Sequence, residues 1–204
     1  MPDLHVYLEQ TDETLAAWAQ AGDMRAFDQL ARRYQANLLR FVRRNFPVII
    51  DDEDVVQEAF LKAFENLARY RPGRLVRTWL FTIAFRVAVS HIRRRRSGLK
   101  LLARFVGRAS SAAPPDGNMH RDELQKVWDD AAKLLTPTQF RAIWLLFAEE
   151  MERSEIAAIL GKTHTTTKLI LYRAQTKMRT YYGLHGAAGA CPPRAENIID
   201  GVHP

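Results

Sequence analysis

Apolar residues recur every three or four positions along most of the chain, and strand-like alternation is almost absent, so the pattern predicts helices. In the first half it predicts four of them, over residues 12–20, 23–44, 51 or 52 to about 68, and 77–96. The positions that would face a common core are Phe27, Leu30, Ala31, Tyr34, Leu38, Phe41, Val55, Val56, Ala59, Phe60, Ala63, Leu67, Trp79, Leu80, Ile83, Ala84, Val87, Ala88 and Ile92. Residues 1–96 are therefore expected to fold as one compact helical domain.

The pattern changes after residue 96. Residues 97–120 contain glycines, serines and two adjacent prolines, and the first acidic residue is Asp116. Such a composition predicts a flexible basic linker. Residues 121–182 predict a second helical domain, with helices over 122–135, from Pro137 with Thr136 as cap, over 152–160 and over 165–181. Residues 183–204 read as a tail, so the expected fold is all-α with two small domains.

The helix at 77–96 has a second face opposite its apolar stripe. Thr82, Arg86, Ser90 and Arg93 fall there at helical spacing, and the helix runs out into the arginines 93–96. We expect this helix to bury one side, to carry cations on the other and to have exposed rings nearby. Such a helix would suit a protein that holds a nucleic-acid backbone electrostatically and offers aromatic surfaces to bases. The alternative is a solvated basic end that complements the helix dipole.

Residues 154–174 have the form of a helix-turn-helix. Ser154 is expected to cap the first helix, and Gly161 allows the left-handed turn. The second helix starts with small polar residues and carries Lys168 and Arg173, as expected of a helix whose N-terminal residues reach base edges in the major groove. A plain helical corner is the alternative.

The helix that begins near residue 52 carries a polar face opposite its apolar stripe, made of Asp54, Gln57, Glu58 and Leu61. Carboxylates do not suit DNA. In a DNA-binding protein such a face suggests a protein partner with a basic surface, and a solvated face is the alternative.

Composition narrows the functional classes. The chain has 204 residues, with 30 Lys+Arg against 23 Asp+Glu, which gives +7 and favours a polyanionic partner. A single cysteine, the lack of a signal peptide and the lack of a long apolar run predict a cytoplasmic protein without membrane insertion. The six histidines show no ligand spacing and there is no phosphate-binding glycine loop. We therefore expect no metal, no cofactor and no enzymatic activity.

Taken together, the segments DVVQEAFLKAF, Tyr70-Arg71, RTWLFTIAFRVAVSHIRRRR, LTPTQFRAIWLLFAEEMERSEIAAILG and TTTKLILYRAQTKMR resemble the two-domain bacterial RNA polymerase sigma factors of the extracytoplasmic-function group. The resemblance covers roughly residues 11–182. It implies a first domain that binds the clamp helices of the polymerase core and opens the downstream promoter element. It implies a second domain that binds the polymerase flap and reads the upstream element, and it makes an anti-sigma factor a candidate further partner.

The resemblance also implies site residues. The polymerase-binding set would be Asp54, Gln57, Glu58 and Leu61. The DNA-binding set would be Tyr70, near an unpaired promoter base, with Arg71, Arg86, Arg93, Arg94, Arg95, Arg96, Thr165, Thr166, Lys168 and Arg173. The chain departs from the family where Arg86 replaces a common asparagine, Lys162 an aliphatic residue, and Leu169-Ile170 the usual Ser-Arg.

We therefore predict a sigma factor that binds core polymerase and directs promoter recognition and opening. Two alternatives are an ordinary helix-turn-helix regulator that binds duplex DNA, and a sigma-like adaptor that has lost promoter recognition. Arg86 in the first domain and Leu169-Ile170 in the second give the adaptor some support.

Overall fold

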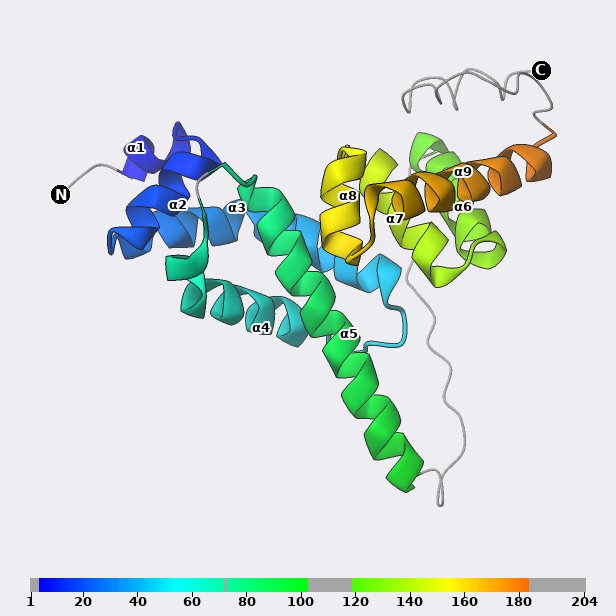
Figure 1. Ribbon diagram of the computed structural model, residues 1–204, viewed down its shortest axis with the longest axis horizontal. Helices are drawn as coiled ribbons and strands as arrows, with labels where there is room; N and C mark the ends of the chain where they lie inside the picture. Colours follow the sequence, from blue (N-terminus) through cyan, green and yellow to red (C-terminus); the bar gives the residue numbers. More distant parts are fainter. Residues whose placement is uncertain (1–3, 72, 103–118, 184–204) are drawn as a thin grey trace. The chain divides into compact units, whose positions relative to one another are not determined.

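The computed structural model describes residues 4–71, 73–102 and 119–183, and these residues are helical with short connections. The chain divides into two compact units, one up to Pro114 and one from Pro115 onward, apart from residues 158–160. Each unit is described by itself (Figure 1).

The first unit is built from five α-helices and one 3₁₀ helix among the described residues. These are α1 (Leu4–Leu8), α2 (Asp12–Gln20), α3 (Met24–Asn45), α4 (Asp52–Glu65), η1 (Leu67–Arg69) and α5 (Val76–Leu102). Helix α3 packs against α1, α2, α4 and α5, and α4 packs along α5. The core between them is aromatic: the Phe41 ring lies 5.2 Å from that of Phe81 and 6.0 Å from that of Phe46.

The predicted helices of this unit are confirmed, with three corrections. Helix α4 ends at Glu65, and the chain to Arg69 is a tighter 3₁₀ turn. Helix α5 continues six residues beyond Arg96 to Leu102, into the segment predicted as linker. The exposed rings expected beside its basic face are not there, because Phe81 is buried and Phe85 half-buried. Six predicted core residues are only half-buried: Ala31, Tyr34, Phe60, Trp79, Ile83 and Ile92.

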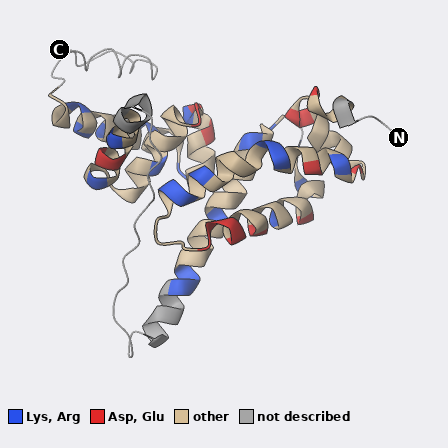
Figure 2. Cartoon of the chain, turned by 180° about the vertical axis from the view of Figure 1, so that it is seen from behind, with Lys and Arg blue, Asp and Glu red and all other residues tan. Residues whose placement is uncertain are grey.

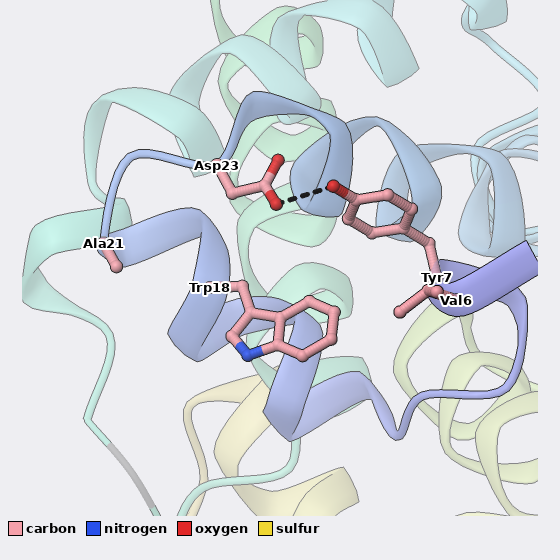
Figure 3. Close-up of a pocket in the computed structure, with 5 residues that line it drawn as sticks. All are labelled: Val6, Tyr7, Trp18, Ala21 and Asp23. Atoms are coloured by element: carbon pink, nitrogen blue, oxygen red, sulfur yellow. Dashed lines mark hydrogen bonds between the residues drawn. The ribbon is translucent and has the colours of Figure 1, made fainter. Parts of the chain in front are cut away.

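Helix α1 was not predicted, because five residues are too short for a periodic pattern. Its Tyr7 is buried, stands edge-on to Trp18 at 5.9 Å, and donates a hydrogen bond of 2.8 Å to Asp23 (Figure 3). The guanidinium of Arg33 holds the end of α1 by donating to the carbonyls of Tyr7, Leu8 and Gln10, and it pairs with Asp12 at 2.7 Å.

The second unit contains α6 (Met119–Leu134), α7 (Pro137–Phe147), α8 (Arg153–Leu160) and α9 (His164–Tyr181). Helix α7 begins with a capping box formed by Thr136 and Gln139, with Pro137 in the first turn as predicted. Trp144 packs on Trp128 at 4.7 Å, which joins α7 to α6.

One expectation for this unit is wrong. Ser154 does not cap α8, because the helix begins at Arg153. The carboxylate of Glu155 instead accepts a hydrogen bond of 2.9 Å from the backbone N–H of Glu152. Of the predicted linker, Ser97–Leu102 continues α5 and α6 begins at Met119, while residues 103–118 lie outside the described residues, as do residues 184–204 of the predicted tail.

Candidate nucleic-acid interface

The outer face of α4 separates charge from core as the sequence predicted. Acidic residues fill its first turn, where they complement the helix dipole, and Val55, Val56, Ala59 and Ala63 are buried. On the opposite side Asp54 and Gln57 are exposed. Leu61 is 63% exposed on the same side of the helix.

Glu58 lies on the same face but is not free. Its carboxylate accepts a hydrogen bond of 2.5 Å from Nε2 of His91, and it pairs with Lys62 at 3.3 Å and Arg94 at 3.9 Å. The hydrogen bond from His91, with a further one from Lys62, lowers the pKa of Glu58. Glu58 therefore joins α4 to the basic end of α5. Sequence reasoning missed His91, because 33 positions separate the partners and no local spacing reveals the pair.

The basic face of α5 is largely exposed. Arg86 and Arg93 are exposed and make no hydrogen bond or ion pair among the residues described here. Arg94 lies near Glu58, and Arg95 donates to the carbonyl of Val48. Helix α5 carries these cations toward an end that extends past α4, as Figures 1 and 2 show. The side chain of Arg96 lies outside the described residues.

Tyr70 differs from the expectation of a ring offered to a base. It is only 5% exposed, packs on Trp79 at 5.1 Å, and its hydroxyl donates to the carbonyl of Arg74. Burial, assisted by the charge of Glu13, raises its pKa. Gln20 fixes the same turn by donating to the Tyr70 carbonyl at 2.8 Å.

The ring thus holds the turn at residues 71–74 in place rather than facing solvent. The exposed side chains here are cationic: Arg71, a DNA-binding candidate from the sequence, together with Arg69 just before the turn and Arg74 at its end. Sequence reasoning gave the last two no role.

The helix-turn-helix is present in α8 and α9. Gly161 has φ 61°, the left-handed conformation that the turn requires. The Thr163 hydroxyl caps α9 by accepting from the backbone N–H of Thr166 at 3.2 Å. Thr165, Thr166, Lys168 and Arg173 are all exposed on α9.

The apolar run in α9 is divided by the fold. Leu171 is buried and Ile170 half-buried, while Leu169 is 46% exposed. Tyr172 is 65% exposed beside Arg173, and sequence reasoning had given it no role. The periodicity of apolar residues cannot identify Tyr172 as exposed, because a tyrosine at this spacing is equally compatible with a buried position in the core.

In the part of the chain that the structure describes, no group of three histidine, cysteine or acidic side chains is placed to hold a metal ion. Within that same part, none of the helices combines the length and apolar character needed to span a bilayer.

Comparison with known proteins identifies the family. The family model Sigma-70 region 2 matches residues 30–98, which span α3 to α5. The ECF RNA polymerase sigma-E factor of Haemophilus influenzae is 32% identical over 178 residues, covering 81% of this chain and 92% of that protein. The sigma-E factor of Escherichia coli K12 is 30% identical over 174 residues, covering 81% of this chain and 91% of that protein.

Solved structures agree. The structure of CnrH in complex with the cytosolic domain of CnrY has a TM-score of 0.58 and 29% identity, covering 86% of this chain and 99% of that one. The sigma factor RpoE of Bartonella quintana, solved with the anti-sigma factor NepR, has a TM-score of 0.64 at 24% identity over 78% of this chain and 98% of that one, and it supports the fold. The chain belongs to the extracytoplasmic-function sigma factors of bacterial RNA polymerase.

Proposed function

We propose that this sigma factor binds core RNA polymerase through Asp54, Gln57 and Leu61 on α4, and promoter DNA through α5 and α9. The observation that carries the proposal is the separation of charge in the first unit. An exposed polar face on α4 and an exposed cationic face on α5 are built on one shared core. Glu58 acts at the junction, where it fixes Arg94 and the end of α5.

On α5, Arg86 and Arg93 are proposed to contact the DNA. An arginine at the Arg93 position is suited to phosphate, where it adds affinity by counterion release. Arg86 stands where the family commonly has asparagine, and a guanidinium there suits a base edge or a phosphate. Tyr70 is proposed to act indirectly, by holding the turn that presents Arg71 and Arg74.

On α9, Thr165, Thr166, Lys168 and Arg173 are proposed to face the upstream element. The exposed Leu169 offers methyl groups in place of hydrogen-bonding atoms. Such a helix grips DNA through phosphates and thymine methyls more than through bidentate bonds to bases.

The remaining expectations follow from this role. The protein is proposed to catalyse no bond chemistry itself, to need no cofactor, and to act in the cytoplasm. Structures of relatives bound to CnrY and NepR support an anti-sigma factor as a further partner.

The decisive experiment is transcription in vitro with core polymerase on a pool of genomic promoters, with sequencing of the start sites. A defined set of start sites that depends on this protein supports the proposal. Tight, specific binding to duplex DNA without polymerase would instead favour an ordinary helix-turn-helix regulator. Polymerase binding without promoter-specific transcription would favour an adaptor.

A further inference from the structure

Helix α3 carries a concentration of arginine that the proposed function does not use. Its 22 residues include six arginines and one aspartate. Arg33 is turned to the end of α1 and Arg44 is half-buried. The other four, Arg25, Arg32, Arg40 and Arg43, are exposed, and together they are called the α3 arginine face.

The four lie on one side of the helix. Seven residues separate Arg25 from Arg32, and eleven separate Arg32 from Arg43, which are close to two and three whole turns. Arg40 lies within a quarter-turn of that line. Figure 2 shows the blue segments recurring along α3.

Two members of this face are compensated by neighbours, Arg43 by Asp52 at 2.6 Å and Arg25 by interactions of its own. Arg32 and Arg40 form no ion pair with another described residue, and Asp28 is the one acidic residue in the helix. Arg40 and Arg43 are three residues apart, a spacing at which like charges repel and destabilise a helix. A solvated helix more commonly interleaves the two signs. An anionic partner would offset the repulsion.

We infer that the α3 arginine face is a second binding surface for the phosphate backbone of duplex promoter DNA. The inference rests on the proposed function, since it assumes that the protein acts on DNA. From Arg25 to Arg43 the helix spans roughly 27 Å, at about 1.5 Å per residue. That length runs beside several phosphates of one strand, which follow one another every 3.4 Å or so.

The remaining side chains of α3 favour contact with the phosphate backbone of DNA over contact with unpaired bases. Gln35 and Ala36, exposed between Arg32 and Arg40, are uncharged and modest in size. Phe27 and Phe41 are buried, and Tyr34 lies on the opposite side of the helix, where its hydroxyl donates to Asp12. The arginine face therefore presents no aromatic ring on which bases could stack. A surface that offers cations but no aromatic rings can contact phosphates, and such contacts position DNA without reading its sequence.

The α3 arginine face is distinct from the basic face of α5. The two helices meet through the buried rings of Phe41 and Phe81, so their outward sides point away from that contact. DNA bound along α5 therefore leaves the α3 cations to engage a further stretch of backbone.

The test is holoenzyme binding to a promoter fragment and to a scrambled fragment across a series of KCl concentrations. The double variant R32Q/R40Q is expected to weaken binding to both fragments by the same factor. The slope of log K against log salt is expected to fall by about two units, one for each lost contact. A variant R32K/R40K should keep the slope, and K126Q/K133Q, which removes two exposed cations of α6, should leave it unchanged.

The other outcomes overturn the inference. If R32Q/R40Q weakens assembly with core polymerase and leaves the salt slope intact, α3 contacts the enzyme instead. An unchanged slope with normal assembly means that the face is only solvated. R93Q in α5 separates this failure from failure of the proposed function: a lowered slope in R93Q alone refutes only the α3 surface, whereas no change in either variant refutes both.

Discussion

The Tyr70 side chain combines two interactions, a ring contact with Trp79 and a hydrogen bond from its hydroxyl to the Arg74 carbonyl. Tyr70→Phe keeps the ring and loses only the hydrogen bond, so it should lower the free energy of unfolding by about 1 kcal/mol. Tyr70→Ala also leaves a cavity and should cost roughly 3–5 kcal/mol. Urea unfolding followed by circular dichroism measures both.

Promoter opening at a temperature where both variants are folded then tests the positioning role of Tyr70. We expect slower opening in both, because the turn with Arg71 and Arg74 loses its anchor. If Tyr70→Ala had the same free energy of unfolding as the wild type, the result would contradict the buried position of the ring.

Glu58 makes stability depend on pH. Its pKa is lowered in the folded protein, mainly by the hydrogen bond from His91. A carboxyl of this kind stabilises the fold above its unfolded pKa of about 4.3 and loses that contribution as the pH falls through its folded pKa. Glu58→Gln should therefore be less stable than wild type at neutral pH, and the difference should shrink as the pH falls from about 5 to about 3.

Urea unfolding at several pH values checks this. Glu65→Gln is the control, since Glu65 is exposed at the end of α4 and no ion pair joins it to another described residue. A difference between wild type and Glu58→Gln that stays constant over this range would show that the carboxylate is not held by His91 and Lys62.

Helix α4 allows a paired test of the polymerase contact. Asp54 and Glu53 both lie in its first turn, so reversing either charge disturbs the helix dipole to a similar extent, about 0.3–1 kcal/mol. Asp54 lies in the middle of the face with Gln57 and Leu61, whereas Glu53 lies at its edge, more than a quarter-turn from Asp54. Asp54→Lys should weaken binding to core polymerase by about tenfold or more, roughly 1.4 kcal/mol, and Glu53→Lys by much less.

Affinity measured by fluorescence anisotropy with labelled protein distinguishes the two variants. Equal losses would attribute the effect to general charge, and no loss in either would remove α4 from the polymerase interface.

The turn between α8 and α9 depends on one glycine. At φ 61° Gly161 is in the left-handed region, and a Cβ there would meet nothing within 4 Å. Gly161→Ala should therefore cost only the backbone strain, about 1–2 kcal/mol. Gly161→Asn should cost less, because asparagine tolerates this conformation better. Thermal unfolding compares the two, and an alanine variant as stable as wild type would refute the strain argument.

At the scale of the whole molecule, the two units are expected to contribute unequally to promoter choice. Scrambling the upstream element should reduce transcription in vitro only a few-fold, because Leu169 and Tyr172 occupy exposed positions of α9 without the bidentate geometry that reads bases. Scrambling the downstream element should abolish specific initiation. A loss of about 100-fold from the upstream change, roughly 3 kcal/mol, would instead demonstrate specific reading by α9.

The sequence was sufficient where a feature is local. Helix periodicity located α2, α3 and α7, and the φ of Gly161 agrees with the predicted turn. Prediction from the sequence failed where segments that are distant along the chain come into contact. The Glu58–His91 pair, the burial of Tyr70 under Trp79 and the docking of α1 all depend on tertiary contacts that have no short-range signature.

The prediction that Ser154 caps α8 was wrong for another reason. Serine is a common capping residue, but Ser154 lies within the first turn of α8, and the neighbouring Glu155 accepts the hydrogen bond from the backbone N–H of Glu152.

The grip of Arg33 on the end of α1 has a practical consequence for handling the protein. Three of its four acceptors are carbonyls of residues 7–10, and the fourth is the Asp12 carboxylate. A shortened version that starts at Thr11, a natural choice from the helix pattern, would leave the half-buried Arg33 guanidinium with Asp12 alone and would uncover the Trp18 ring. A purification tag should therefore be placed before an intact α1, because removing α1 would expose the apolar surface that Tyr7 covers.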